Sequence, residues 1–223
     1  MKKGSGESRP LWAGGAEVHS GKPLLHDRSV DVCVVGGGIA GLTTAYLAAR
    51  EGLQVMVLDD GPIAGGESAR TTAHLSNALD ARYERVETVH GESGARLAAR
   101  SHTEAIARIG KIVFDERIDC DFERVDGYLF LPPGGDPSVL DREWEAARRA
   151  GLTGVERVAR CPLASFESGA ALRFPGQAQL HPVRYLAGLV RALEALGVGS
   201  TLGRTWWTSS TATRCACRRV TSA

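Results

Sequence analysis

The hydrophobic pattern near the start of the chain predicts a strand, a helix and a second strand in that order. Residues Asp31–Val35 form a short apolar run, typical of a parallel strand that is covered on both faces. A helix is predicted from Ile39 to about Glu51, because this stretch is rich in alanine and leucine and is followed by Gly52. The apolar run Leu53–Leu58 predicts the next strand. This order indicates an α/β fold with a parallel sheet.

A glycine motif separates the first predicted strand from the helix. The residues that fit the spacing G-x-G-x-x-G are Gly36, Gly37, Gly38, Ile39, Ala40 and Gly41. Gly36 allows a tight turn, Gly38 leaves room for the backbone to approach a pyrophosphate, and Gly41 lets the helix lie close to the sheet. The first N–H groups of a helix have no partner inside it and carry the positive end of its dipole. The motif therefore predicts a dinucleotide-binding site.

An acidic residue follows at the distance that such a site requires. Asp59 ends the second predicted strand, close to the ~20-residue separation expected for the carboxylate that accepts hydrogen bonds from an adenosine ribose. Asp60 is the alternative candidate. We favour Asp59 because Asp60-Gly61-Pro62 has the composition of a turn.

The segment after the second strand differs from an ordinary crossover. Residues 61–76 are small, polar and rich in glycine for most of their length, whereas a typical crossover is shorter and leads into a helix. Such a loop can bring backbone N–H groups and the hydroxyls of Ser68, Thr71 and Thr72 against a large anionic cofactor. This segment favours FAD over NAD as the cofactor.

Three segments, VVGGGIAGLTTAYLAAREG, VLDDG and GGESARTTAHLS, resemble the D-amino-acid oxidase-like family of FAD-dependent oxidoreductases, also called the glycine and sarcosine oxidase group. The GESARTTAHL segment is most similar to bacterial members that often carry a Rieske iron–sulfur domain. The resemblance is strong over residues 29 to about 80 and is traceable to about 197. It implies a Rossmann-like FAD-binding domain with a parallel sheet and an α+β substrate domain, which is incomplete here.

The resemblance also implies how FAD is bound. Gly36, Gly38, Gly41 and Asp59 would hold its ADP half, and the residues near the pyrophosphate or the isoalloxazine ring would be Arg70, Thr71 and Thr72. His74 lies in the same loop, but the histidine that tethers flavin in some relatives lies a few positions earlier. We therefore expect His74 to form hydrogen bonds or to pack, and the flavin to be noncovalent.

The implied activity is oxidation of an amine or amino acid, with hydride transfer from a C–N bond to the flavin. In the family the substrate-facing residues come mostly from later in the chain, so no catalytic residue can be nominated here. Two alternatives stay open. One is a truncated, catalytically inactive fragment that binds FAD or ADP; the other is an NAD-dependent dehydrogenase that uses the same glycine motif.

Residues 80–133 predict a helix followed by a hairpin. Apolar residues at helical spacing mark one face of a helix from Asp80 to Phe114, namely Ala105, Ile109, Ile112 and Val113. The alternating residues 118–123 and the run Tyr128–Leu131 flank Asp126-Gly127, which predicts two paired strands joined by a turn.

Two further helices are predicted by their ends and their apolar positions. Asp136-Pro137 has the composition of a helix start, and Gly151 is typical of a helix end. The apolar positions between them are Leu140, Trp144 and Ala147. Pro182 and Gly197 delimit the last helix in the same way, with a buried stripe of Val183, Leu186, Val190 and Leu193.

We expect four segments: a flexible leader (1–28), the N-terminal part of the FAD-binding domain (29–80), helical and hairpin parts of the FAD and substrate domains (81–197), and an atypical tail (198–223). The resemblance implies a strand after Gly197 that rejoins the sheet. Instead, the chain from Gly199 onward contains four arginines and no acid. When the codons around Trp206-Trp207-Thr208 are translated in a shifted reading frame, this segment becomes a strand-like sequence. We interpret the tail as an out-of-frame product of a longer natural protein.

The amino-acid composition of the chain argues against nucleic acid, membrane and metal as partners. The 223 residues are 43% apolar with a net charge of +1 and no basic run, which argues against nucleic acid. No apolar stretch reaches the ~18 residues of a membrane span. The five cysteines without a CxxC pair indicate a reduced, cytoplasmic protein, and the histidines lack the spacing of metal ligands. We expect a small-molecule amine or amino-acid substrate and no metal, and the sequence predicts no oligomeric state.

Overall fold

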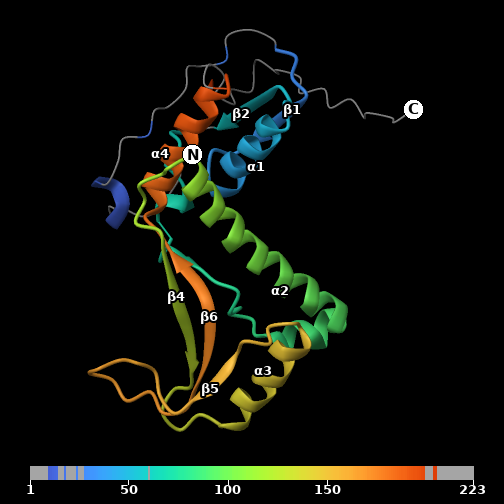
Figure 1. Cartoon of the computed structure of the whole chain (residues 1–223), viewed down its shortest axis with the longest axis vertical. Coiled ribbons are helices and arrows are strands. Elements are labelled where there is room, and N and C mark those ends of the chain that lie inside the picture. The colour runs from blue at the N-terminus through green and yellow to red at the C-terminus, as the bar shows by residue number, and fades with distance from the viewer. Residues whose placement is uncertain are drawn as a thin grey trace, which may run out of the picture. The chain divides into compact units, whose positions relative to one another are not determined.

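The computed structural model of the chain describes residues 10–14, 18, 24, 28–59, 61–198 and 203–204 (Figure 1). Internal contacts divide the chain into two compact units, one formed by Met1–Arg70 with Pro182–Ala223 and the other by Thr71–His181. The domain ranges expected from the sequence stay a prediction. Most of the leader 1–28 and of the tail 198–223 lies outside the described residues.

The first unit contains the predicted strand, helix and strand. Its elements are η1 (Leu11–Gly14), β1 (Val32–Val35), α1 (Ile39–Arg50), β2 (Val55–Asp59), η2 (Glu67–Ala69), α4 (Pro182–Ala195) and β7 (Gly203–Arg204). Strands β1 and β2 are parallel, in register from Val32↔Val55 to Val35↔Leu58. The two residues of β7 pair in parallel with the end of β2, so the strand order is β1-β2-β7. The α/β class is confirmed.

Two details of the first strands differ from the prediction. The second strand begins at Val55 rather than at Leu53, although it ends at Asp59 as predicted. The expectation that the first strand is covered on both faces is wrong at its end, because the Val35 side chain is 81% exposed. Among the described strands β1 pairs only with β2, whereas β2 has a neighbour on each side and buries Val55, Met56 and Val57.

Helix α4 is buried on almost every side and packs beside α1 (Figure 1). The predicted stripe is confirmed, since the buried residues of α4 include Val183, Leu186, Val190 and Leu193. Tyr185 is fully buried, and its hydroxyl lies 3.3 Å from the hydroxyl of Thr43 on α1. A helix with so few exposed positions is typical of the interior of an α/β layer.

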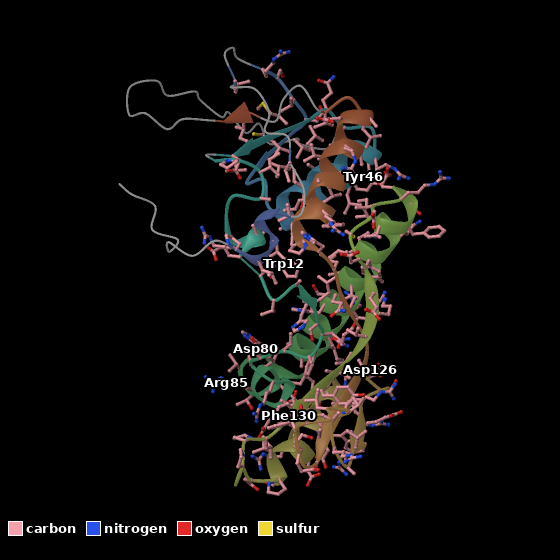
Figure 2. The ribbon with its side chains drawn as sticks, turned by 90° about the vertical axis from the view of Figure 1, so that its left-hand side faces the viewer. Trp12, Tyr46, Asp80, Arg85, Asp126 and Phe130 are labelled. Carbon is pink, nitrogen blue, oxygen red and sulfur yellow. The ribbon has the colours of Figure 1, made fainter. Side chains whose placement is uncertain are left out.

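The second unit is an antiparallel sheet with two helices. Its elements are β3 (His74–Leu75), α2 (Tyr83–Asp115), β4 (Glu123–Phe130), α3 (Ser138–Arg149), β5 (Glu156–Val158) and β6 (Ala171–Gln179). The strand order is β3-β6-β4, and β5 also pairs with β6. Figure 2 shows Asp126 and Phe130 along β4. Leu172 and Phe174 of β6 join Tyr83 of α2 and Leu140 of α3 in a common buried cluster.

The predicted hairpin is wrong. Residues 118–122 are not a strand, and β4 continues through Asp126-Gly127 to pair with β6, which lies about fifty residues later. The register shifts between Val125 and Gly127 because β6 places two residues, Pro175 and Gly176, opposite Asp126. Asp126-Gly127 therefore marks a β-bulge rather than a turn.

The bulge accommodates the buried side chain of Gln177. A β-carbon added at Gly127 would lie 3.1 Å from Cγ of Gln177. The Gln177 amide oxygen accepts hydrogen bonds from the N–H of Asn77 (2.7 Å) and the hydroxyl of Ser76 (3.0 Å), and its nitrogen donates to Oδ1 of Asn77 (2.8 Å). This side chain thus ties β6 to the segment that follows β3.

We expect Gln177→Met to lower the free energy of unfolding by about 2 kcal/mol, because it removes the partners of the backbone N–H and of the side-chain oxygen Oδ1 of the buried Asn77. Chemical denaturation monitored by circular dichroism measures the effect. Gln179→Met on the same strand is the control, since the Gln179 side chain is exposed and donates to the exposed Glu123. Equal stability of the two variants would contradict the prediction.

The predicted long helix is confirmed with one interruption. Within α2, Gly91 has φ 71° and ψ 173°, which breaks the helix into two parts. Ile109 and Ile112 are buried as expected, but Ala105 is exposed and Ile106 is buried in its place. The buried face of this part of α2 therefore includes Ile106, Ile109 and Ile112, which are spaced three residues apart.

Helix α3 begins after Asp136-Pro137 as predicted. The Asp136 carboxylate accepts hydrogen bonds from the hydroxyl of Ser138 and, at 3.0 Å, from the N–H of Ser138. The hydroxyl bond first, and then the N–H bond, lower the pKa of Asp136. Leu140 and Ala147 are buried, and the indole N–H of Trp144 donates to the carbonyl of Val155 at 3.0 Å. Helix α3 is thus held at its start by Asp136 and along its apolar face by Leu140, Ala147 and Trp144.

Candidate functional site

The glycine motif forms the connection from β1 to α1. Gly36 has φ +108°, a conformation that favours glycine, and its N–H donates to the carbonyl of Leu58 on β2 at 2.7 Å. Helix α1 starts at Ile39 with Gly38 as its N-cap, and Gly38 has no side chain to cap the helix. The loop therefore turns sharply off the strand and presents the backbone at the start of the helix.

Gly41 lies in the first turn of α1, close to the backbone of Gly36 in the loop. A β-carbon at this position would collide with the carbonyl oxygen of Gly36 and would lie 3.3 Å from Cγ1 of Val34. No other residue fits here without displacing α1 from β1. This contact is the close approach of helix and strand that the third glycine of the motif permits.

Asp59 connects β2 to the glycine loop. Its Oδ2 accepts the N–H of Gly37 at 2.6 Å, and its Oδ1 accepts the N–H of Gly61 at 2.8 Å. The carboxylate is half-buried at the end of the strand. Asp60, the alternative acid, lies outside the described residues.

Ser68 reaches the same helix start from η2. Its Oγ accepts the N–H of Ile39 at 3.2 Å, and a β-carbon on Gly38 would lie 2.9 Å from this oxygen. The structure therefore brings together the glycine motif, Asp59 and Ser68 within the first unit. Arg70 is an exposed residue of this unit, whereas Thr71 and Thr72 belong to the second unit, as does His74, which is exposed and pairs with Gln179 across β3 and β6.

The start of α1 has free hydrogen-bond donors. Within the described residues, the N–H groups of Gly38, Ala40 and Gly41 have no hydrogen-bond partner. Donors of this kind at a helix N-terminus suit an anionic oxygen, and the absence of a Gly38 side chain leaves space beside them. The residues present thus fit the diphosphate of a dinucleotide.

Sequence reasoning missed the role of Gly61 in this arrangement. The N–H of Gly61 donates to the side chain of Asp59 two residues earlier, which is the geometry of an Asx turn. An aspartate two residues before a glycine is a signal for this turn. The composition of Asp60-Gly61-Pro62 predicts a turn that starts at Asp60, whereas in the structure the turn is closed by Asp59.

Other kinds of site find no support in the part of the chain that the structure describes. In that part no three His, Cys, Asp or Glu side chains gather as a metal site would require. None of the described helices combines the length and apolar character of a membrane span. The prediction that the protein binds no metal stays a prediction.

Comparison with known proteins identifies the family. The family model for FAD dependent oxidoreductases (DAO) matches residues 31–203, which include β1, the glycine loop, β2 and α4. The chain belongs to this family. The cofactor of the family is FAD, as the resemblance implied.

Two curated relatives illustrate the match. The chain is 30% identical over 186 residues to the Bacillus subtilis protein YhfW, described as a Rieske 2Fe-2S iron-sulfur protein, covering 83% of this chain and 36% of the relative. It is 29% identical over 171 residues to the gamma-glutamylputrescine oxidoreductase of Escherichia coli, covering 75% of this chain and 40% of the relative. The chain therefore spans about two fifths of the length of these relatives.

A solved structure shares the fold. The L-amino acid deaminase from Proteus myxofaciens superposes with a TM-score of 0.63 at 18% sequence identity, covering 82% of this chain and 40% of that structure. At this identity the likeness establishes the fold only. The FAD-binding type of α/β fold is thereby confirmed.

Proposed function

We propose that this protein binds FAD noncovalently and is an oxidoreductase that removes hydride from the C–N bond of a small amine or amino acid. The observation that carries the proposal is the match of the FAD dependent oxidoreductase family over the segment that holds the glycine loop and Asp59. The similarity to a gamma-glutamylputrescine oxidoreductase supports an amine or amino-acid substrate.

We assign the ADP half of the cofactor to the first unit. The free N–H groups at the start of α1 would receive the diphosphate, and Asp59 would accept the ribose hydroxyls. Ser68 stands beside the diphosphate position because its Oγ already lies next to Ile39 N–H. The other residues of this unit that we assign to FAD are Gly36, Gly37, Ile39, Asp60 and Arg70. Thr71 and Thr72, which belong to the second unit, stay a prediction from the family resemblance.

The contribution of the chain's own residues is binding and orientation. When bound, FAD supplies the acceptor for a hydride from the carbon next to the substrate nitrogen. The glycine loop and Asp59 would hold the far end of the cofactor, at a distance from that chemistry. The described residues include no group that we assign as a catalytic acid or base.

Purified protein with a flavin absorbance spectrum, bleached anaerobically by an amine or amino acid, is the expected result. Apoprotein that binds NAD tightly and takes up no FAD would support the alternative of an NAD-dependent dehydrogenase instead. A panel of small amines and amino acids would define the substrate class.

We expect the flavin to be released when the holoprotein is precipitated with acid, since no covalent attachment through His74 is proposed. The yellow colour should appear in the supernatant, and its absorbance measures the released fraction. Colour retained in the washed precipitate would contradict noncovalent binding.

A second candidate function is cofactor binding without turnover. The observation in its favour is that the described residues provide a glycine loop and Asp59 for cofactor binding but no group that we assign as a catalytic acid or base. Bound flavin that no amine or amino acid reduces, but that dithionite does reduce, would favour this candidate. Reduction by a substrate would exclude it.

We also propose a cytoplasmic location. The basis is the cysteine usage of the chain, and within the described residues Cys33, Cys120 and Cys161 form no disulfide. Fractionation of cells that express the protein tests this location.

A further inference from the structure

We infer that Asp59 is a positioning residue that holds the glycine loop in its binding conformation, in addition to the ribose contact proposed for it. The inference rests on the proposed function, because the loop matters only if it receives the cofactor diphosphate. It assigns to one carboxylate two separable contributions to cofactor affinity.

The loop requires an external tether because of its composition. Gly36, Gly37 and Gly38 are three consecutive glycines, and glycine loses more backbone freedom on ordering than any other residue. A loop of this kind does not hold one conformation by its own side chains, since it has none. Its conformation must come from hydrogen bonds to neighbouring elements.

The structure provides these hydrogen bonds in sequence along the loop. The N–H of Gly36 donates to the carbonyl of Leu58, and the N–H of Gly37 donates to the carboxylate of Asp59 at 2.6 Å. The bond to Asp59 has a charged acceptor and is the shorter of the two. Gly37 is buried, so the loss of this acceptor would leave its N–H without solvent to replace it.

The carboxylate is itself held in place. Its other oxygen accepts the N–H of Gly61, and a β-carbon on Gly37 would lie 3.3 Å from Oδ2 and 3.2 Å from Cγ1 of Ile63. Each oxygen of an ionised carboxylate can accept about two hydrogen bonds, so one acceptor position on each stays available. Asp59 can therefore tether Gly37 and accept ribose hydroxyls at the same time.

The chain offers a matched control at the opposite end of the same two strands. The Oδ2 of Asp31 accepts the N–H of Gln54 at 2.8 Å, which connects the residue before β1 to the residue before β2. Asp31 is exposed and lies away from the glycine loop in sequence and in register. Asp31→Ala thus removes a similar aspartate–backbone bond between the strands without touching the loop.

The two contributions of Asp59 are separated by a ligand that lacks the ribose hydroxyls. The experiment measures, by isothermal titration calorimetry, the binding of ADP and of 2′,3′-dideoxy-ADP to the full chain and to its variants Asp59→Ala, Asp59→Asn and Asp31→Ala. Dideoxy-ADP keeps the diphosphate but offers Asp59 no hydroxyl. Its affinity therefore reports the loop and not the ribose contact.

We expect Asp59→Ala to weaken dideoxy-ADP binding about tenfold, the effect of losing one hydrogen bond to a charged acceptor, and to weaken ADP binding further. Asp31→Ala should change both affinities less than about twofold, which is the range of a surface substitution outside the site. Circular dichroism checks the folding of each variant. If Asp59→Ala does not fold, Asp59→Asn provides the test, since its amide oxygen accepts only one of the two N–H groups.

One outcome would overturn the positioning role and leave the proposed function intact. In that outcome the wild-type protein binds ADP, and the Asp59 variants lose affinity for ADP but keep wild-type affinity for dideoxy-ADP. Equal weakening by Asp31→Ala would also overturn it, because the effect would then belong to the sheet. Wild-type protein that binds neither ADP nor FAD would overturn the proposed function and this inference together.

Discussion

Replacing Gly41 by alanine is expected to lower the free energy of unfolding by about 3–4 kcal/mol and to abolish FAD uptake. The added β-carbon would collide with the carbonyl oxygen of Gly36, which is a backbone atom and cannot rotate away. Relief requires α1 to move away from β1, which separates the helix start from the loop. The same displacement removes the N–H groups that we assign to the diphosphate.

The measurement is chemical denaturation of the apoprotein together with a titration of flavin fluorescence. Gly66→Ala is the matched control, because a β-carbon on Gly66 meets no atom within 4 Å and its φ is negative. We expect this control to change stability by less than about 0.5 kcal/mol. A Gly41→Ala protein with wild-type stability and flavin affinity would show that the helix does not approach the loop as described.

Replacing Glu143 by alanine is expected to lower the free energy of unfolding by a similar amount, about 3–4 kcal/mol. Glu143 is 1% exposed, and its two carboxylate oxygens accept the N–H groups of Tyr83 at 2.9 Å and Glu84 at 3.0 Å. This side chain of α3 therefore satisfies the free donors at the start of α2. Alanine leaves both donors without an acceptor and also opens a cavity.

Glu143 also predicts a pH dependence of stability. Burial raises the pKa of Glu143 above its ordinary value, against the lowering effect of the two backbone hydrogen bonds. Over the interval between the ordinary and the raised pKa the folded protein binds more protons at this site than the unfolded chain does. The contribution of Glu143 to stability should therefore fall as pH rises through that interval.

Two variants test this dependence by denaturation at a series of pH values. Glu143→Gln cannot titrate, so the part of the slope due to this site should disappear, while overall stability falls because the amide group satisfies only one of the two N–H donors. Glu145→Gln on the same helix is the control, since the Glu145 side chain is 59% exposed and should leave the slope unchanged. Identical slopes for all three proteins would contradict the assignment.

The candidate site was largely predictable because its residues are close in sequence. β1, the glycine loop, α1 and β2 form one local unit, and each glycine has a conformational or steric requirement that sequence spacing reveals. The acid at the end of β2 follows from the same local unit. What spacing did not reveal is that Asp59 bonds to Gly37 and Gly61, because the direction of a side chain depends on how the strand end meets the loop.

The second unit shows where local patterns fail. Residues 118–131 have the alternation and the Asp-Gly pair of a hairpin, yet β4 pairs with β6 and the Asp126-Gly127 pair forms a bulge. A bulge depends on the partner strand, here on Pro175-Gly176 and on the buried Gln177, about fifty residues away. No local signal distinguishes it from a turn.

The amino-acid sequence by itself determined the class of this protein: the α/β order of its first elements, the glycine motif with its acid, and the FAD dependent oxidoreductase family. These depend on backbone requirements and periodicities that short segments express directly. Only the tertiary structure decided the exposure of Val35, the pairing of β4 with β6, and the partners of Asp59, Glu143 and Gln177. Each of these depends on a contact between residues distant in sequence, and the energy of such a contact exists only once the chain has folded.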